Sequence, residues 1–391
     1  MGMIEEVKKE LTENIIPFWK GLRDDVHGGY YGYLSYDLAL DRKAVKGCIL
    51  NNRITWFFSN AYTLLKDPSL LEEAKHGYAF LREHCLDREN GGVYWSMTYD
   101  GQPEDTTKHT YNQAFCIYAL SSYYEASGDK EALDEAYGLF EIIEGKCRDE
   151  GGYLEAFDRE FRPASNEKLS ENGVMATRTM NTLLHVFEAY TELYRVDHNE
   201  KVGNCLRWIL DCFAEKMYHP ALHRQEVFFD HEYQSLIDLY SYGHDIETSW
   251  LIDRGVEVLG DRAYLEKMLP ITRDLAENVK KVAFDGHSLA NECDRGVVNT
   301  DRIWWVQAET LIGFINAYQK DGSRRDFLEA AHAEWAFIRD HLIDRREGSE
   351  WFYAVTQEGE PDTQKRPIVE PWKCPYHNGR MCIEVIRRNV E

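Results

Sequence analysis

Apolar residues recur at helical spacing along most of the chain, and they do so in paired segments. Residues 110–127 form one apolar-periodic run, and Asp129 is placed to cap a second run over residues 130–146. The same pairing recurs at residues 177–196 with 200–216, 244–259 with 262–282, and 301–320 with 323–342. The pattern predicts a mostly helical chain of about twelve helices in about six pairs.

Glycine-containing segments separate these helix pairs. Each segment has an acidic residue, Asn or His, then glycine, then alternating aromatic residues and a polar turn, a pattern typical of a short hairpin. The segments begin at His27, Asn90, Glu150, Asp285 and Glu347. A weaker version without the glycines begins at Leu222, inside the longest interval. The spacing indicates a repeat of about sixty residues.

The repeat predicts how the helix pairs assemble. A unit of this size cannot bury its own apolar face and packs on its neighbours, as an open solenoid or as a closed double-layered ring. An open array needs polar caps at both ends, but the last unit, CPYHNGRMCIEVI over residues 374–386, is apolar and rich in reactive side chains. No Pro/Gly/Ser-rich linker interrupts the chain. We therefore predict an all-α fold, a single (α/α)6 barrel with short β-hairpins in its loops, as one domain over residues 1–391.

Charge and cysteine usage narrow the functional class. Lys and Arg number 45 against 68 Asp and Glu, a net charge of −23, which argues against nucleic acids and anionic membranes as partners. No apolar run approaches the roughly 18 residues of a membrane span, and the acidic N-terminus lacks the apolar stretch of a signal peptide. The nine cysteines are scattered without a Cys-x-x-Cys motif, as free thiols are in a reducing compartment. We expect a cytoplasmic protein.

The segment SYGHDIETSW, residues 241–250, is the first candidate for chemistry. His244 and Glu247 are three residues apart, on one helix face, and Trp250 follows three residues later. A carboxylate beside an imidazole raises its basicity and fixes its tautomer. The alternative is a helix start with an incidental pair.

Two further segments are rich in aromatic and titratable residues. EPWKCPYHNGRMC, residues 370–382, contains Trp372 and His377; Cys374 has no partner pair that would complete a metal site, so we expect no metal. TDRIWWVQAE, residues 300–309, carries adjacent Trp304 and Trp305 and then Glu309. Adjacent residues do not share a helix face. One tryptophan is therefore expected to line a cleft while its neighbour packs in the wall, unless both lie in the core.

Other polar residues lie in otherwise apolar helices. Arg53 needs an anionic or strongly polar partner, either a wall carboxylate or a substrate oxyanion. Asn181 and His185 are four residues apart, although a lone histidine on an apolar face is more often a core residue, and Tyr111 begins an equivalent helix. No nucleotide-binding glycine loop and no Gly-x-Ser-x-Gly elbow is present. The 10 Trp, 24 Tyr and 17 Phe suit an aromatic-lined sugar cleft.

Six segments from one end of the chain to the other carry a family resemblance. NNRITWFFSNAY, KHTYNQAF, MNTLLHVFEAY, SYGHDIETSWL, RIWWVQAE and WKCPYHNGRM resemble the N-acylglucosamine 2-epimerase superfamily, and within it the cellobiose 2-epimerases. The resemblance implies an isomerase that needs no organic cofactor. It implies reversible epimerisation at carbon 2 of the reducing-end glucose or mannose in β-1,4 disaccharides such as cellobiose, lactose and mannobiose. It also implies a monomer, with a homodimer as the alternative.

The resemblance implies a role for each candidate residue. His244, backed by Glu247, and His377, beside Trp372, are the two acid/base residues on opposite faces of the sugar. Their polar supports are Arg53, Tyr111, Asn181, His185, Glu247 and Glu309. The tryptophans that would stack on sugar are Trp304, Trp305, Trp372 and, as a neighbour, Trp250. Glu309 would hold either His377 or a substrate hydroxyl.

Three other functions stay open. One is a relative's reaction, 2-epimerisation of N-acylglucosamine or isomerisation of mannose or another aldose to a ketose. Another is inverting glycoside hydrolysis, for which Glu247 and Glu309 would stand about 6.5–9.5 Å apart. The third is a non-catalytic sugar-binding scaffold, which would have no need for two histidines with carboxylate neighbours.

Overall fold

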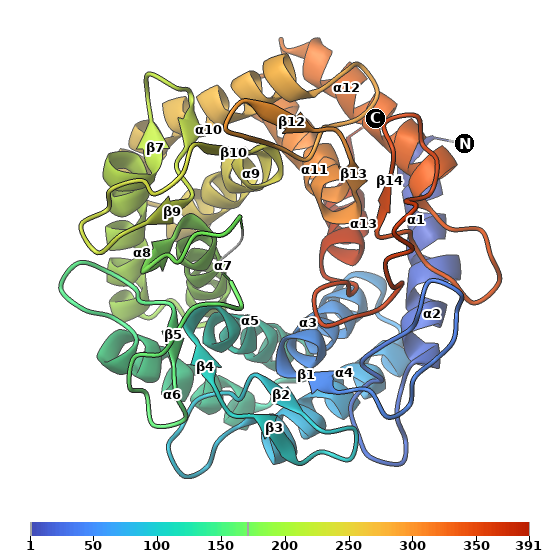
Figure 1. Cartoon of the computed structure of the whole chain (residues 1–391), viewed down its shortest axis with the longest axis vertical. Coiled ribbons are helices and arrows are strands. Elements are labelled where there is room, and N and C mark those ends of the chain that lie inside the picture. The colour runs from blue at the N-terminus through green and yellow to red at the C-terminus, as the bar shows by residue number, and fades with distance from the viewer. Residues whose placement is uncertain (1, 170–171, 391) are drawn as a thin grey trace.

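The computed structural model describes residues 2–169 and 172–390, and its helices form two concentric rings (Figure 1). The inner ring consists of α3 (Cys48–Leu65), α5 (Thr110–Ser127), α7 (Met180–Asp197), α9 (Tyr242–Leu259), α11 (Trp304–Lys320) and α13 (His377–Arg388). Each inner helix contacts the next, and α13 contacts α3, so the inner ring is closed. The predicted mostly helical chain is confirmed.

The outer ring surrounds the inner one. It consists of α4 (Pro68–Phe80), α6 (Lys130–Lys146), α8 (Glu200–Cys212), α10 (Arg262–Ala283), α12 (Arg325–Phe337) and the N-terminal α1 (Met3–Lys9) and α2 (Ile16–Gly21). Several outer helices contain a π-helical turn, at η1 (Glu10–Ile15), η2 (Leu81–Cys85), η3 (Phe213–Met217) and η4 (Ile338–Leu342). Helix α1 packs on α13, so the two ends of the chain meet.

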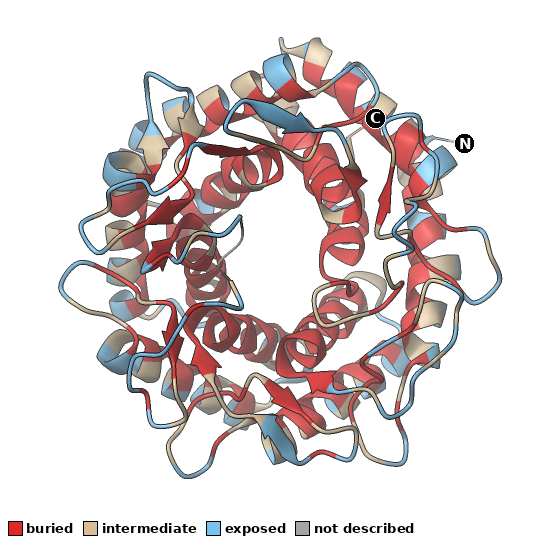
Figure 2. Cartoon of the chain, in the orientation of Figure 1, coloured by how far each residue is buried: buried red, intermediate tan, exposed pale blue. Residues whose placement is uncertain are grey.

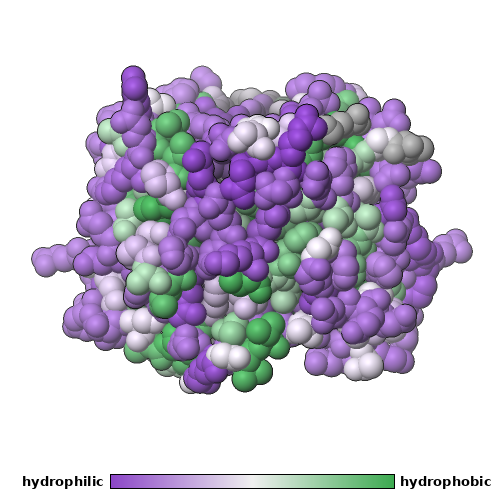
Figure 3. Space-filling model, turned by 90° about the horizontal axis from the view of Figure 1, so that it is seen from above, coloured by the Kyte–Doolittle hydropathy of each residue, from purple (hydrophilic) through white to green (hydrophobic). Residues whose placement is uncertain are grey.

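Burial explains the two rings. Helix α5 is buried continuously from Thr110 to Tyr123, as a helix surrounded by protein must be. Helix α8 instead buries a single stripe that includes Val202, Leu206 and Ile209 and turns its other face outward. Figure 2 shows the same contrast around the whole ring. On the side seen in Figure 3 the surface is mostly hydrophilic, with smaller apolar areas between. Within the described residues no helix is long and apolar enough to cross a membrane.

A side-chain cap begins four of the outer helices, α4, α6, α8 and α10. The side chain of Asp129 accepts from the backbone N–H of Glu131, as the sequence predicts. Asp67, Asn199 and Asp261 do the same at the starts of α4, α8 and α10. Such a cap satisfies a backbone donor that has no partner inside its helix.

The glycine-containing segments form small antiparallel turns after the outer helices. The bridges that close them are Arg23 with Tyr30, Leu86 with Val93, Arg148 with Tyr153, Phe284 with Leu289 and Ile343 with Trp351. In the weaker unit, β7 (Tyr218–His219) pairs with β8 (Arg224–Gln225). The predicted hairpins are therefore present, although most are shorter than a regular two-stranded ribbon.

Short strands lead directly into inner helices and tie neighbouring units together. The antiparallel sets are β1 (Lys46–Gly47), β2 (Ser96–Met97) and β3 (Pro103–Asp105); β4 (Lys108–His109) and β5 (Ala156–Phe157); β6 (Arg178–Thr179) and β9 (Phe228–Phe229); β10 (Leu239–Ser241), β11 (Glu292–Asp294) and β12 (Val297–Asn299); and β13 (Arg302–Ile303) and β14 (Ala354–Val355). They collect the N-termini of the inner helices at one end of the ring (Figure 1).

Buried ion pairs fix this end of the ring. Asp87 accepts from backbone N–H groups of its own turn, and it also accepts from Lys108 Nζ at 2.8 Å, just before α5. Asp24 and Lys46 form the equivalent pair before α3, at 2.7 Å. Both pairs are buried, so breaking either one would leave an uncompensated charge.

Candidate active site

A cavity of about 290 Å³ opens at the end of the ring where the inner helices begin. All of the predicted site residues line it except Glu309 and Trp250. The cavity also takes residues that the sequence did not single out, namely Lys168, Leu169, Val227, Phe228, Leu239, Ser241, Asn291, Glu292, Ile303, Tyr353 and Arg366.

The site residues converge because they occupy the first turns of successive inner helices. Tyr111 is in the first turn of α5, Asn181 of α7 and His244 of α9, while His377 begins α13. The amide dipoles at helix N-termini favour negative charge nearby. The ring therefore surrounds the cavity with partial positive charge.

His377 is held by a carboxylate from the neighbouring inner helix. Its Nδ1 lies 2.8 Å from Glu309 Oε1, and the indole of Trp250 donates to Glu309 Oε2 at 2.9 Å. An ionised Glu309 accepts the Nδ1 proton, which leaves Nε2 as the basic ring nitrogen. Burial, followed by the positive charges of Arg380 and Arg53, lowers the pKa of His377 well below its usual value.

The contacts of Glu309 and Trp250 bear on two of the predictions. Glu309 accepts from His377 and does not line the cavity, which favours the support of His377 over contact with a substrate hydroxyl. Trp250 is buried behind it, with the Arg380 guanidinium 4.8 Å from its ring centroid. The prediction that Trp250 stacks on sugar is therefore wrong, because its indole N–H faces Glu309 and its ring face is covered.

His244 has a different partner from the one predicted. Its Nδ1 lies 2.7 Å from the Ser241 hydroxyl, whereas Glu247 Oε1 accepts from Arg380 Nη2 at 2.5 Å. The i,i+3 spacing puts both side chains on one helix face, but the carboxylate turns to the cation on α13. Burial, and then repulsion from His185, lowers the pKa of His244 to about 3. A pKa this low favours the neutral imidazole.

Arg53 is a buried cation that faces aromatic rings and polar oxygens. Among the described residues its guanidinium donates to Tyr111 Oη at 2.8 Å and to the Trp372 carbonyl at 3.4 Å. Its carbon Cζ lies 4.2 Å from the ring centroid of Phe115 and 4.6 Å from that of Tyr376. The wall carboxylate considered as its partner is not among these contacts. Its positive charge is thus directed at the cavity without being neutralised by a carboxylate.

His185 belongs to a charged cluster that the sequence did not reveal. Its Nδ1 lies 2.9 Å from Glu188 Oε2, which also accepts from the Tyr376 hydroxyl at 2.5 Å. Arg380 donates to Glu188 through Nη1, and through Nη2 to Glu247 and Glu309. Arg380 lies three residues after His377 and has no obvious partner in the sequence. This was the sequence feature that could have indicated the cluster.

Three groups of this cluster could hold a cation. One ligand atom from each of Glu247, Glu309 and His377 lies within 4.8 Å of the others. Arg380 already donates to both carboxylates, so their negative charge has a cationic partner. The same short separation argues against the inverting-glycosidase pairing of Glu247 and Glu309, which needs about 6.5–9.5 Å for a water between the carboxyl groups.

Aromatic rings form the remaining wall. The ring centroid of Trp305 lies 4.8 Å from that of His244 and 5.5 Å from that of His377, so one indole adjoins both imidazoles. Trp304 also lines the cavity, and the prediction that only one of these tryptophans does so is wrong. Trp372 lies 5.9 Å from Tyr111, centroid to centroid.

Comparison with known proteins identifies the family. Residues 20–377 match the family described as N-acylglucosamine 2-epimerase. The chain is 53% identical to a cellobiose 2-epimerase of Eubacterium cellulosolvens over 99% of both chains. It superposes with a TM-score of 0.98 on a sugar epimerase from a ruminal bacterium, 52% identical over all of both chains.

More distant structures share the fold. A cellobiose 2-epimerase from Bacillus thermoamylovorans has a TM-score of 0.94 at 45% identity, over 98% of this chain and 99% of its own. A D-mannose isomerase has a TM-score of 0.83 at 19% identity, over 98% of this chain and 97% of its own. The chain therefore belongs to the N-acylglucosamine 2-epimerase family and is an epimerase, an enzyme of the isomerase class.

Proposed function

We propose that this enzyme reversibly epimerises carbon 2 of the reducing-end glucose or mannose of β-1,4 disaccharides, with cellobiose, lactose and mannobiose as substrates. The observation that carries the proposal is the pair of imidazoles, His244 and His377, that adjoin one indole at one cavity. The relatives above 50% identity that are named cellobiose 2-epimerases support the substrate class. We further propose a cytoplasmic, monomeric enzyme whose residues 1–391 form one (α/α)6-barrel domain, a homodimer being the alternative.

Ring opening is the first step. Carbon 2 of a closed sugar ring carries a hydrogen that is not acidic, whereas carbon 2 next to an aldehyde does. His377 can take the proton of the anomeric hydroxyl on Nε2 and return it to the ring oxygen, which breaks the bond between carbon 1 and that oxygen. Glu309 holds the Nδ1 side of the ring throughout, so the imidazole is regenerated in the same tautomer.

Proton transfer at carbon 2 is the second step. His377 removes the carbon 2 proton of the glucose form, and the electron pair moves into the aldehyde to give an enediolate. His244 then delivers a proton to the opposite face, which yields the mannose form, and the roles reverse in the other direction. His244 takes up its transferable proton from solvent before this step, while His377 is neutral. Both imidazoles are protonated beside the enediolate, and only His377 stays protonated once His244 has protonated carbon 2. The negative enediolate favours the protonated imidazoles that burial disfavours.

The wall stabilises the charge that develops. Arg53 and the Tyr111 hydroxyl form a donor pair at the cavity, suited to the two oxygens of an enediolate. Asn181 Oδ1 has no hydrogen-bond partner among the described residues and can accept from a sugar hydroxyl. Trp305 and Trp372 offer flat faces for sugar rings, as aromatic residues in carbohydrate sites do.

A product assay tests the proposal. The purified protein is incubated with cellobiose in heavy water, with a chelator and no added cofactor. We expect glucosyl-mannose that carries deuterium at carbon 2. Glucosyl-fructose would indicate an aldose–ketose isomerase, released glucose a glycosidase, and turnover of N-acylglucosamine or mannose alone the relatives' reactions. Each of these outcomes would overturn the proposed function.

A further inference from the structure

One guanidinium on the last helix joins carboxylates from three other inner helices. Arg380 Nη1 donates to Glu188 of α7, and Nη2 donates to Glu247 of α9 at 2.5 Å and to Glu309 of α11 at 2.7 Å. All four side chains are buried. Because burial removes the screening by water, each charge strongly affects the others.

Each carboxylate leads to a different part of the cavity. Glu188 holds His185, and Glu309 holds His377. Glu247 lines the cavity itself, and its Oε2 has no hydrogen-bond partner among residues 2–169 and 172–390. Arg380 does not line the cavity, so it can act on substrate only through these neighbours.

The charges in the cluster do not balance. Three ionised carboxylates beside one guanidinium would leave two uncompensated negative charges in a buried space. The carboxylate with the fewest donors is the one that is most easily neutralised. Within the part of the chain that the structure describes, Glu188 and Glu309 each accept from three side chains, whereas Glu247 accepts from Arg380 alone.

The pKa values of Glu188 and Glu247 differ in the same sense, although burial, opposed by Arg380, also raises the pKa of Glu309. Burial opposes the ionisation of Glu188, but Arg380 and His185 outweigh it and lower its pKa to about 2. Burial, and then the charge of Glu309, raises the pKa of Glu247 to about 7, against the opposing effect of Arg380. The titratable and charged groups that face Glu247 from the surrounding helices are His185, Glu188, Glu309, His377, Arg380, Tyr111 and Tyr376.

We propose, on the basis of the proposed epimerase function, that Arg380 is a positioning residue that distributes one proton among three carboxylates. It keeps Glu188 and Glu309 ionised as acceptors for His185 and His377. It leaves Glu247 protonated, as a neutral acid whose hydroxyl donates a hydrogen bond into the cavity. A single cation thereby sets the protonation state of all three carboxylate supports.

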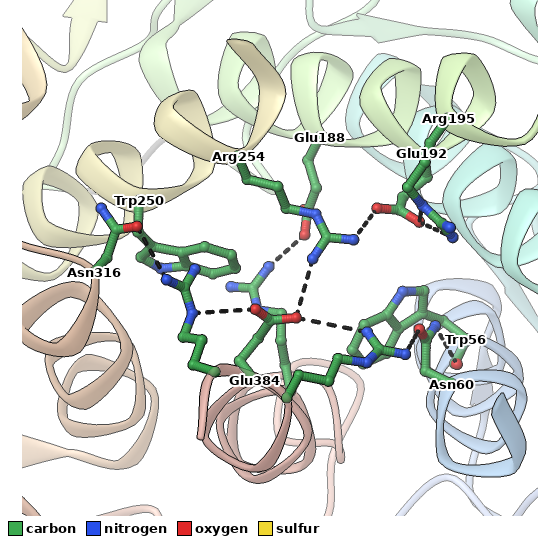
Figure 4. Close-up of polar contacts among 12 residues, drawn as sticks. Trp56, Asn60, Glu188, Glu192, Arg195, Trp250, Arg254, Asn316 and Glu384 are labelled. Carbon is green, nitrogen blue, oxygen red and sulfur yellow. Dashed lines mark hydrogen bonds and ion pairs between the residues drawn. The ribbon is translucent and has the colours of Figure 1, made fainter. Parts of the chain in front are cut away.

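The chain contains a matched control for Arg380. About two helical turns beyond Glu247 on α9, Arg254 is held between Glu192 of α7 at 2.5 Å and Glu384 of α13 at 3.0 Å, as Figure 4 shows. Arg254 also bridges two buried carboxylates on other helices, although its own side chain is partly exposed. It does not line the cavity and touches none of the three carboxylates that Arg380 joins.

The experiment compares Arg380→Lys, Arg254→Lys and Glu188→Gln by kcat, KM and the pH profile of kcat. A lysine ammonium is one point charge and cannot replace two guanidinium nitrogens that serve separate partners. Arg380→Lys should lower kcat by about 30-fold or more, leave KM within about threefold, and move the acid limb up by about one pH unit, because the lysine ammonium cannot contact all three carboxylates. Glu188→Gln removes one negative charge beside Glu247 and Glu309, so the acid limb should move down.

Arg254→Lys should lower the midpoint of unfolding without moving the acid limb. An acid limb that stays fixed in Arg380→Lys and Glu188→Gln, or that moves equally in Arg254→Lys, would overturn the proposal. If Arg380→Lys fails to fold, Glu188→Gln carries the test alone, because glutamine keeps the shape and one acceptor oxygen.

A second readout separates this proposal from the proposed function. Protein labelled with nitrogen-15 in its histidines reports the tautomers of His377 and His185 by NMR without turnover. We expect the Nδ1–H form of His377 in the wild type and its loss in Arg380→Lys, but not in Arg254→Lys. Wild-type protein that does not epimerise cellobiose would refute the proposed function, whereas an unchanged His377 tautomer in Arg380→Lys would refute the role of Arg380.

Discussion

Replacing Glu309 by glutamine would test whether the orientation of His377 limits catalysis. Glu309 accepts from His377 Nδ1 at 2.8 Å, Arg380 Nη2 at 2.7 Å and Trp250 Nε1 at 2.9 Å. Glutamine has the same shape, but it offers one acceptor oxygen and one donor amide. His377 and Arg380 share Oε1 while Trp250 bonds to Oε2, so the amide must face either Trp250 or the pair of His377 and Arg380. In the second orientation the amide donates to the imidazole, which then has to adopt the other tautomer.

The expected loss follows from these contacts. A hydrogen bond to a charged group contributes about 1.5–3 kcal/mol, and about 1.4 kcal/mol corresponds to a factor of ten in rate. The loss of one such bond together with the wrong tautomer on the catalytic imidazole should lower kcat by about 10²- to 10⁴-fold. KM should change little, because Glu309 does not line the cavity.

Steady-state epimerisation of cellobiose measures both constants, with circular dichroism as a check of folding. Glu192→Gln is the matched control, since Glu192 is a buried carboxylate that accepts from Arg195 and Arg254 away from the cavity. It should destabilise the fold and leave the kcat of the folded fraction within about threefold. A Glu309→Gln enzyme with near wild-type kcat would show that the carboxylate does not control His377.

Three further predictions concern single residues. Arg53→Lys should lower kcat by about ten- to a hundredfold in the same assay, because an ammonium cannot bond to Tyr111 and to the enediolate at the same time. An unchanged kcat would refute this prediction. Trp372→Ala should raise KM for cellobiose by about tenfold, with a smaller effect on kcat, whereas a pure kcat effect would contradict a role in binding. Burial raises the pKa of Asp245 to about 8, so the folded state holds a proton that the unfolded state has released above about pH 4. This contribution to stability is complete below about pH 4 and falls by about 1.4 kcal/mol per pH unit up to about pH 8. Asp245→Asn should flatten the urea-unfolding stability between pH 5 and 8, and an unchanged slope would contradict the buried neutral acid.

The repeat could be predicted from the sequence because each unit expresses it locally. Helical periodicity, the cap at Asp129 and the glycine turns depend on contacts within a few residues, and the structure contains them. The first-turn positions of Tyr111 and His244 follow from the same local rules. These rules and the family resemblance together were enough to predict most of the side chains that line the cavity.

The carboxylate supports could not be assigned in this way. Glu247 shares a helix face with His244, yet it pairs with Arg380, which is 133 residues further along the chain. Glu188 and Arg380 are 192 residues apart, and local spacing does not show which faces of two helices meet across a ring. Trp250 was misplaced for the same reason, because its partner Glu309 lies on another helix.

The most direct test of the two-histidine mechanism is the fate of carbon 2 in a His244→Asn enzyme. In heavy water this enzyme should still open the ring and exchange the carbon 2 proton of cellobiose through His377, but it should not deliver a proton to the opposite face. Recovered cellobiose should therefore carry deuterium at carbon 2 while no glucosyl-mannose forms, as mass spectrometry and NMR would show. Normal production of glucosyl-mannose, or recovered cellobiose without deuterium from a folded enzyme, would contradict the account.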